Sequence, residues 1–292
     1  MTDGVLRDHT IASSSTTTKA DARTRKEAKS SPLLIKSSVT ATTMEIKAIQ
    51  FTNNGFMTQA FAFGGEDKSD GSPDIKYPSS LQNYLIDTGS EVILVDTGFP
   101  AGTPYPEPTP KTQIHVGSPT QTYMEGFNAL GYSPEQVTKI LLTHKHPDHS
   151  GELKSFPNAK VYVGPEDADA MKLTGDNVIR CEYSDGSYHN FPHAQKIVDG
   201  VYFIKARGHT NGNSIIIAEN DGLYYMFHGD VTYTDAALKA NKLSVVFEDL
   251  AAARETLDRV REFIKHNPTV YLSTHTPEGV TNLEGKVIMR LD

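Results

Sequence analysis

Three histidines and one aspartate lie within six consecutive residues of this chain. They are His144, His146, Asp148 and His149. The apolar run at 137–142 precedes them and predicts a buried strand, which Pro147 and Gly151 prevent from continuing. Imidazole nitrogens and carboxylate oxygens are the ligands that zinc and similar cations prefer. We therefore expect a metal site at the end of this strand. The alternative, a solvated loop rich in histidine, does not require this order of residues at a strand end.

The spacing within this motif suggests two ligand directions. His144 and His146 are two residues apart, so both side chains can point the same way from the end of the strand. Asp148 and His149 follow the turn and can face a second point close by. The motif could thus contribute ligands to two neighbouring metal positions.

Three further candidate ligands are isolated in the sequence, and each follows an apolar run. They are His209, Asp230 and His275, after the runs at 201–204, 223–227 and 270–272. Since each run predicts a strand, each candidate would stand where a strand ends. The chain therefore offers enough ligands for more than one metal ion.

The order of these motifs resembles that of the metallo-β-lactamase-fold hydrolases: His-x-His-x-Asp-His, then Gly-His, then Gly-Asp, then a late histidine. The resemblance extends from about residue 44 to the end of the chain. It implies an α/β protein, an αββα four-layer sandwich with a dinuclear metal site along one edge. The predicted sequence of strands, helix, strands and helix is compatible with that architecture.

With this resemblance, the ligands divide into two sets around two divalent metal ions. We expect His144, His146 and His209 to hold one metal, Asp148, His149 and His275 to hold the other, and Asp230 to bridge both. Zn²⁺ is the first choice, with manganese, iron or cobalt as alternatives, because histidine and aspartate accept all of them.

One aspartate and three further histidines are not expected to bind metal directly. Asp96 follows a predicted hairpin, and in the family that the chain resembles this aspartate lies beneath the metal site, where it would fix a ligand by hydrogen bonds. A simple turn residue is the alternative. We expect His228 to pack or to make a supporting hydrogen bond, and we expect His189 and His193 to be surface residues.

The chain divides into an N-terminal extension at 1–42 and a catalytic domain at 43–292. The extension contains a run of Ser and Thr and has seven basic and four acidic residues, which leaves 21 basic and 32 acidic residues in the domain, a balance of −11. We expect this low-complexity extension to be disordered and dispensable. Its acidic residues argue against an organellar targeting peptide, so we expect a cytoplasmic protein.

Several local predictions concern the surroundings of the site. We expect an edge strand at 46–51 paired with a strand at 57–63, followed by an exposed loop at 64–80. Six prolines at 99–122 predict a long loop that forms a wall of the substrate site, lined by Tyr105, Ile114 or His115.

Three negative features narrow the substrate class. The single cysteine, Cys181, precedes His209, which differs from β-lactamases with a cysteine ligand. Only seventeen residues follow His275, too few for the C-terminal helical domain of glyoxalase II enzymes. The acidic domain disfavours nucleic acid as a partner. A membrane is likewise not expected as a partner, because no stretch approaches the ~20 apolar residues of a membrane helix.

One positive feature favours lactones. Tyr233 stands three residues after Asp230, and this is similar to the N-acyl homoserine lactone lactonases, the quorum-quenching enzymes. Its hydroxyl could donate to the substrate carbonyl oxygen as negative charge develops there. The alternative is a core tyrosine, one of thirteen in the chain. Pro147 and the loop at 99–122 depart from the lactonase pattern and leave the acyl-chain preference open.

We therefore predict a hydrolase that opens a lactone or a related small-molecule ester. Hydroxide held by the metals would attack the carbonyl carbon, Tyr233 would stabilise the oxyanion, and Asp148 would return a proton to the leaving alkoxide. A thioesterase or phosphotriesterase would use the same residues with another pocket. A mononuclear iron sulfur dioxygenase would not need all seven ligands, and a non-enzymatic binding module would need none. The oligomeric state stays open.

Overall fold

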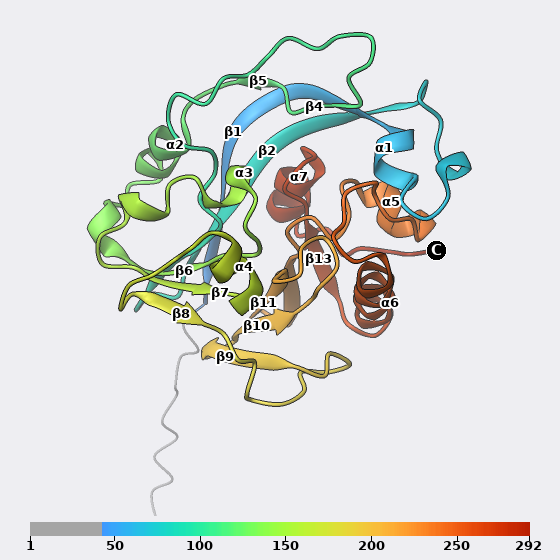
Figure 1. The fold of residues 1–292 in the computed structure, drawn as a ribbon. Coiled ribbons are helices and arrows are strands. Elements are labelled where there is room, and N and C mark those ends of the chain that lie inside the picture. Colours follow the sequence, from blue (N-terminus) through green and yellow to red (C-terminus); the bar gives the residue numbers. More distant parts are fainter. Residues whose placement is uncertain (1–42) are drawn as a thin grey trace, which may run out of the picture. The chain divides into compact units, whose positions relative to one another are not determined.

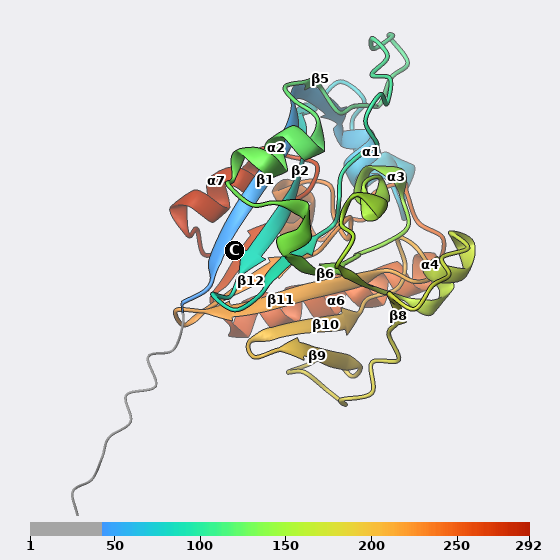
Figure 2. The same cartoon turned by 90° about the vertical axis from the view of Figure 1, so that its left-hand side faces the viewer.

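The computed structural model describes residues 43–292, so the predicted disordered extension lies outside the described residues. The described part consists of two β-sheets and the helices that cover them (Figures 1 and 2). No helix in residues 43–292 is both long enough and apolar enough to cross a membrane.

The first sheet is mixed, with antiparallel pairs at one side and parallel pairs at the other. In spatial order its strands are β4 (Ile114–His115), β1 (Glu45–Thr58), β2 (Lys76–Asp87), β3 (Val92–Val95), β6 (Val137–Leu141), β7 (Lys160–Val163) and β8 (Val178–Arg180), and β5 (Ser118–Pro119) pairs with β1. Strands β3, β6, β7 and β8 run in the same direction, so their carboxyl ends lie at one edge.

The second sheet has five strands. In spatial order they are β13 (Thr269–Leu272), β12 (Leu223–Phe227), β11 (Ser214–Asn220), β10 (Val201–Lys205) and β9 (Ala194–Val198). β12 and β13 are parallel, and β10 has the same direction because both it and β12 are antiparallel to β11. The loops that follow β10, β12 and β13 therefore leave from the same edge.

Helices and short turns complete the described domain. The α-helices are α1 (Gln59–Phe63), α2 (Tyr123–Ala129), α3 (Pro147–Ser150), α4 (Pro165–Ala170), α5 (Asp235–Ala240), α6 (Leu250–His266) and α7 (Glu278–Gly285). Three 3₁₀ turns lie at Lys68–Asp70, Pro134–Gln136 and Leu153–Ser155.

Three apolar clusters separate the layers. Tyr123 and Phe127 of α2 pack on the outer face of the first sheet. The inner faces of the two sheets meet through residues such as Ile93 and Phe203. Leu257 and its helix neighbours on α6 pack on the outer face of the second sheet (Figure 1). The order helix, sheet, sheet, helix confirms the predicted αββα four-layer sandwich.

The predicted pairing of a strand at 46–51 with one at 57–63 is wrong. β1 continues to Thr58, and the chain then turns into α1, where the Thr58 Oγ1 accepts a hydrogen bond from the Phe61 amide at 3.2 Å. The partner of β1 is β2, which begins at Lys76, inside the predicted loop at 64–80. A threonine cap followed by small and aromatic residues is compatible with a helix start, so the sequence does hold a local signal for this helix.

Candidate metal centre

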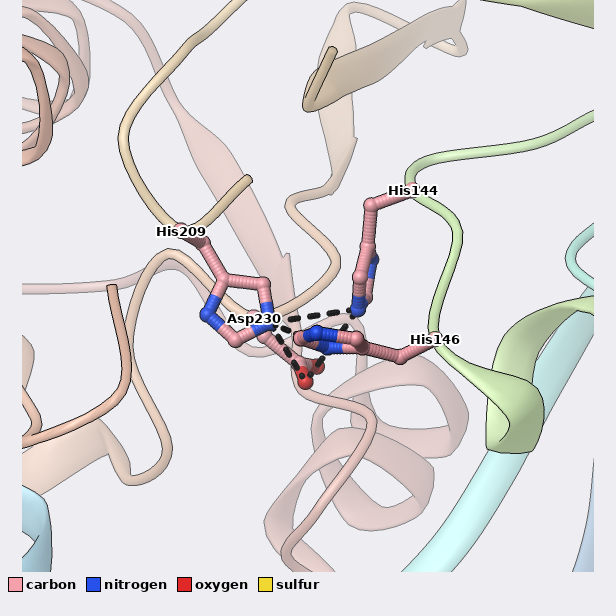
Figure 3. A group of neighbouring side chains, drawn as sticks. All are labelled: His144, His146, His209 and Asp230. Carbon is pink, nitrogen blue, oxygen red and sulfur yellow. Dashed lines mark hydrogen bonds and ion pairs between the residues drawn. The ribbon is translucent and has the colours of Figure 1, made fainter. Parts of the chain in front are cut away.

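All seven predicted ligands come together as two overlapping groups. One group is His144, His146, His209 and Asp230, shown in Figure 3, and the other is Asp148, His149, Asp230 and His275. Within each group, one ligand atom per residue lies within 4.8 Å of the others. Asp230 belongs to both groups, as expected of a bridging carboxylate.

The ends of strands bring these residues together. His144 follows β6, His146 caps α3, and Asp148 and His149 lie inside that short helix. Each of the others stands in the loop after one strand: His209 after β10, Asp230 after β12 and His275 after β13. The site thus lies where the carboxyl ends of strands from both sheets meet, the usual ligand position in open α/β sheets.

The three histidines of the first group face one another through ring nitrogens. His209 Nε2 lies 3.2 Å from His144 Nε2 and 3.0 Å from His146 Nδ1. The Nδ1–H of His209 donates to the Val246 carbonyl oxygen at 3.0 Å, and His144 Nδ1 lies 2.9 Å from the Thr143 hydroxyl. With their protons on Nδ1, the two Nε2 atoms cannot hydrogen-bond to each other, so a cation between them fits this arrangement.

The protonation of the first group suits metal binding. Burial lowers the pKa of His144 well below its usual value, and the neighbouring His149 lowers it further. Burial, followed by the proximity of His209, lowers the pKa of His146 to about 4. Both rings are therefore neutral near pH 7, the form that ligates metals.

The second group combines two carboxylates with two histidines. Asp230 Oδ1 lies 3.2 Å from His149 Nε2, and Asp230 Oδ2 lies 3.0 Å from His275 Nε2. Asp148 Oδ2 lies 3.4 Å and 3.3 Å from the same two nitrogens. Burial lowers the pKa of His149 and of His275, but the carboxylates outweigh it, leaving the former well above its usual value and the latter at about 9. A metal entering here would displace protons.

Asp96 supports the site, as its position in the sequence suggested. Its Oδ1 accepts from the Thr143 amide at 2.7 Å, and its Oδ2 accepts from the Thr143 hydroxyl at 2.7 Å and from His149 Nδ1–H at 2.6 Å. These bonds turn His149 Nε2 toward the second group. Asp96 adopts a φ of 64°, which aspartate tolerates better than most residues and which is common at functional sites.

A glycine lets the loop of Asp230 approach the loop of His144. Gly229 has a φ of 60°, and a Cβ there would stand 2.9 Å from the Thr143 hydroxyl. The positive φ and the close approach both favour glycine at this position.

Tyr233 is buried beside both groups. Its ring stacks on that of His275 with centroids 4.7 Å apart, and it lies 6.0 Å from the ring of His209. Burial, followed by the charges of Asp230 and Asp148, raises the pKa of Tyr233 well above its usual value. Its hydroxyl therefore keeps its proton and remains a donor at neutral pH.

Two of the three candidate wall residues from the loop at 99–122 lie near the site. Burial, with the charge of Asp148, raises the pKa of the partly exposed Tyr105. Ile114 packs against the buried cluster that contains Tyr233. His115 instead places its ring 5.9 Å from that of Phe56.

Within residues 43–292, the other histidines and the cysteine lie outside the two groups. His228 is buried and stacks on Tyr271, with centroids 3.8 Å apart. His189 and His193 are exposed, as expected. Cys181 is buried, and burial raises the pKa of its thiol to about 12, so it is not a reactive thiolate.

Two acidic residues that the sequence pattern does not single out contact the loops of the first group: Asp167 and Glu248. Asp167 lies in the first turn of α4, where an acidic residue is common for reasons of the helix dipole alone. Glu248 stands two residues before the start of α6. Only their long-range contacts distinguish them.

Comparison with known proteins gives the family. Residues 82–275, more than half of the chain, match the model of the Metallo-beta-lactamase superfamily. An N-acyl homoserine lactonase from Bacillus sp is 25% identical over 205 residues, which cover 64% of this chain and 78% of the relative.

Solved structures share the fold. A mutant of B. thuringiensis AiiA with N-decanoyl-L-homoserine bound at the active site has a TM-score of 0.63 at 19% identity, covering 82% of this chain and 96% of that one. AidC, described as a dizinc quorum-quenching lactonase, has a TM-score of 0.58 at 14% identity, covering 80% and 88%. With histidine and aspartate groups suited to divalent metal, this chain is a metal-dependent hydrolase that belongs to the metallo-β-lactamase superfamily.

Proposed function

We propose that this protein is a dinuclear metal-dependent hydrolase that opens a lactone or a related ester, with N-acyl homoserine lactones as the first substrates to test. One observation supports the proposal above all others. Two groups of ligands share Asp230, and the hydroxyl-bearing ring of Tyr233 lies against one of them. Relatives whose names describe lactonases support the choice of lactone.

In this proposal, His144, His146 and His209 hold one ion, Asp148, His149 and His275 hold the other, and Asp230 bridges them. Two divalent ions, with Zn²⁺ as the first choice, would supply a hydroxide nucleophile at neutral pH and Lewis acidity toward the carbonyl. The number of ions follows from the number of groups, since each group offers four donors.

Tyr233 has the properties of a donor to the developing oxyanion. It is only 4% exposed, and its raised pKa keeps the proton on the phenol. A hydrogen bond from a buried donor stabilises the tetrahedral transition state more than the planar ester, because the negative charge on oxygen grows along the reaction.

Asp148 has the properties of a proton carrier. Burial would raise its pKa, but His149 and His275 lower it to well below its usual value, so the carboxylate is charged at neutral pH. It can accept the proton released by the attacking water and return it to the leaving alkoxide. Its side chain is 14% exposed, which leaves it accessible to a substrate.

The charge balance and the domain organisation complete the proposal. The balance of −11 over residues 43–292 favours a small-molecule substrate over nucleic acid. We assign catalysis to this domain alone and treat residues 1–42 as a dispensable extension. The acyl-chain preference then depends on Tyr105, Ile114 and the rest of the wall.

A substrate panel tests the proposed function. Homoserine lactones, thioesters and phosphotriesters would be assayed with protein loaded with Zn²⁺ or Mn²⁺, and with the Asp230→Ala variant as the control for the metal site. Lactone opening that Asp230→Ala abolishes supports the proposal. Activity toward thioesters or phosphotriesters alone would replace the substrate, and uptake of one iron without hydrolysis would overturn the proposal in favour of an oxygenase.

A further inference from the structure

Two carboxylates outside the ligand groups each bind both of the loops that carry the three histidines of the first group. We call residues 143–151 the first ligand loop, which carries His144 and His146, and residues 206–213 the second ligand loop, which carries His209. The carboxylates are those of Asp167 and Glu248.

Asp167 connects the two loops through three hydrogen bonds. Its Oδ2 accepts from the Lys145 amide at 2.9 Å and from the Thr210 hydroxyl at 2.7 Å, and its Oδ1 accepts from the Gly212 amide at 3.0 Å. The residue is fully buried. Lys145 stands between His144 and His146, and Thr210 directly follows His209. The carboxylate thus holds the backbone next to all three histidines.

The packing around Asp167 leaves no room for a side chain at Gly212. A Cβ on Gly212 would stand 2.5 Å from the Asp167 amide nitrogen and 2.7 Å from its Cβ. Glycine at this position therefore allows the second ligand loop to lie directly against the start of α4. Both the hydrogen bonds and the steric fit fix the distance between loop and helix.

Glu248 makes a second connection nearer the surface. Its side chain pairs with Lys145 Nζ and accepts from the Asn211 amide at 2.7 Å, and its own amide donates to the Gly208 carbonyl at 2.9 Å. At 32% exposure this side chain is screened by solvent, so we expect it to contribute less than Asp167.

His146 is the ligand that depends most on these connections. The rings of His144 and His209 are each fixed by a hydrogen bond of the nitrogen that faces away from the group. Within residues 43–292, the His146 ring makes no hydrogen bond except its contact with His209. Its direction is therefore set by its backbone, which Asp167 holds through the adjacent amide of Lys145.

We propose that Asp167 is a positioning residue that preassembles the three-histidine group for a metal ion, with Glu248 in a weaker, parallel role. The inference rests on the proposed function only in assuming that this group binds metal. Asp96 has the corresponding role for the second group through His149. Loss of Asp167 should therefore weaken one metal position and spare the other.

Metal affinity tests this inference without reference to activity. The metal-free protein would be titrated with Co²⁺, followed by its visible absorption, and with Zn²⁺ in competition with a chelator. In Asp167→Asn, the side-chain NH₂ group replaces one carboxylate oxygen and must face one of the three groups that donate to Asp167. We expect the affinity for one of the two bound metal ions to fall about 10–100-fold. In a His275→Ala background, which removes a ligand of the second group alone, the remaining Co²⁺ position should still weaken with Asp167→Asn.

Matched controls separate positioning from general damage. Asp169→Asn makes the same charge change on the same helix, at an exposed residue that pairs with Arg180 at 2.8 Å, and should leave both affinities unchanged. Glu248→Gln should lower the affinity for the same metal ion as Asp167→Asn does, but by a smaller factor. Unchanged affinities in Asp167→Asn, or equal weakening of both equivalents, would overturn the inference. If the wild-type protein binds two metals but opens no lactone, the proposed function fails while this inference stands.

Discussion

At the scale of single residues, the histidines are prepared for metal by the bonds of their outward nitrogens. His144, His149 and His209 each direct one nitrogen to Thr143, Asp96 or the Val246 carbonyl. The other nitrogen of each ring then faces the centre of a group. Such partners fix the tautomer and the ring direction and are commonly worth about 10–100-fold in metal affinity.

The role of Tyr233 can be tested by removing only its hydroxyl. Tyr233→Phe keeps the ring that stacks on His275 and should leave the metal content unchanged. We expect kcat for lactone opening to fall about 10²-fold, the usual effect of losing one donor to an oxyanion. Tyr202→Phe, on β10 and remote from both groups, is the matched control. Equal kcat values for Tyr233→Phe and the wild type would make Tyr233 a packing residue.

The sequence points to the seven candidate ligands and to Asp96, but not to Asp167 and Glu248. The candidate ligands stand after apolar runs, and the resemblance to the family divides them into two groups. Asp167 and Glu248 lie 22 and 103 residues from Lys145 along the chain, and no local pattern announces contacts over such separations. Their role follows only from the folded structure.

At the scale of elements, the site depends on strands that end at a common edge. Parallel pairing of β3 with β6 and of β12 with β13 brings the loops of Asp96, His144, Asp230 and His275 together. The run at 57–63 was misassigned because a short apolar segment fits both a strand and a helix until its capping residue is considered. The loop at 99–122 was predicted from its prolines, although two residue pairs within it join β1 as β4 and β5.

The contact between α5 and α7 should be sensitive to pH. Asp235, at 6% exposure, accepts from Asn282 Nδ2 at 2.8 Å. Burial and the charge of Glu278 raise its pKa to about 7, against an opposing effect of Asn282 and Lys239. Between about pH 4 and 7 the folded protein then binds more protons than the unfolded chain, so its stability should fall as the pH rises through this range.

Substitution of this aspartate should remove that dependence. In Asp235→Asn, the side-chain oxygen can still accept from Asn282, and no charge develops. We expect the variant to gain stability relative to the wild type between about pH 4 and pH 8, by on the order of a few kcal/mol, measured by urea unfolding at both pH values. Asp74→Asn, at an exposed position, is the control. A parallel pH dependence of the variant and the wild type would contradict the assignment.

At the scale of the whole molecule, the four layers were predictable because the family resemblance supplied their order. Composition and periodicity alone gave strands and helices, not the meeting of two sheets. Large buried aromatic residues pack between the sheets and on their outer faces, for example Phe203, Phe227 and Phe127. This apolar packing holds the sheets together, so the loops at the strand ends are free to carry the polar candidate ligands.

Metal binding should stabilise the entire fold. Ions that bind only the folded state add about 4 kcal/mol at a thousandfold excess over Kd, and for a domain of this size that corresponds to a rise in Tm of roughly 10 °C. We expect a chelator to lower the Tm by this order and Zn²⁺ to restore it, measured by scanning calorimetry. In His209→Ala the effect should be clearly smaller. A Tm that responds to neither chelator nor Zn²⁺ would argue against a metal centre in the fold.

The proposed domain organisation predicts that residues 43–292 suffice for catalysis. The chain shortened to this range should retain the metal content and the kcat/KM of the full chain within about twofold, since all seven ligands and Tyr233 lie inside it. Both proteins would be compared in the same lactone assay. A large loss of activity with unchanged metal content would assign a role in substrate binding to the first 42 residues.

A titration that joins metal content to ring opening tests the dinuclear lactonase site. Metal-free protein would be titrated with Zn²⁺ while the hydrolysis of an N-acyl homoserine lactone is followed by the acid that it releases. The dinuclear site predicts activity that rises until two equivalents are bound, and none in Asp230→Ala at any ratio. Full activity at one equivalent would rule out the need for two metal ions, and two bound equivalents without ring opening would rule out a lactonase.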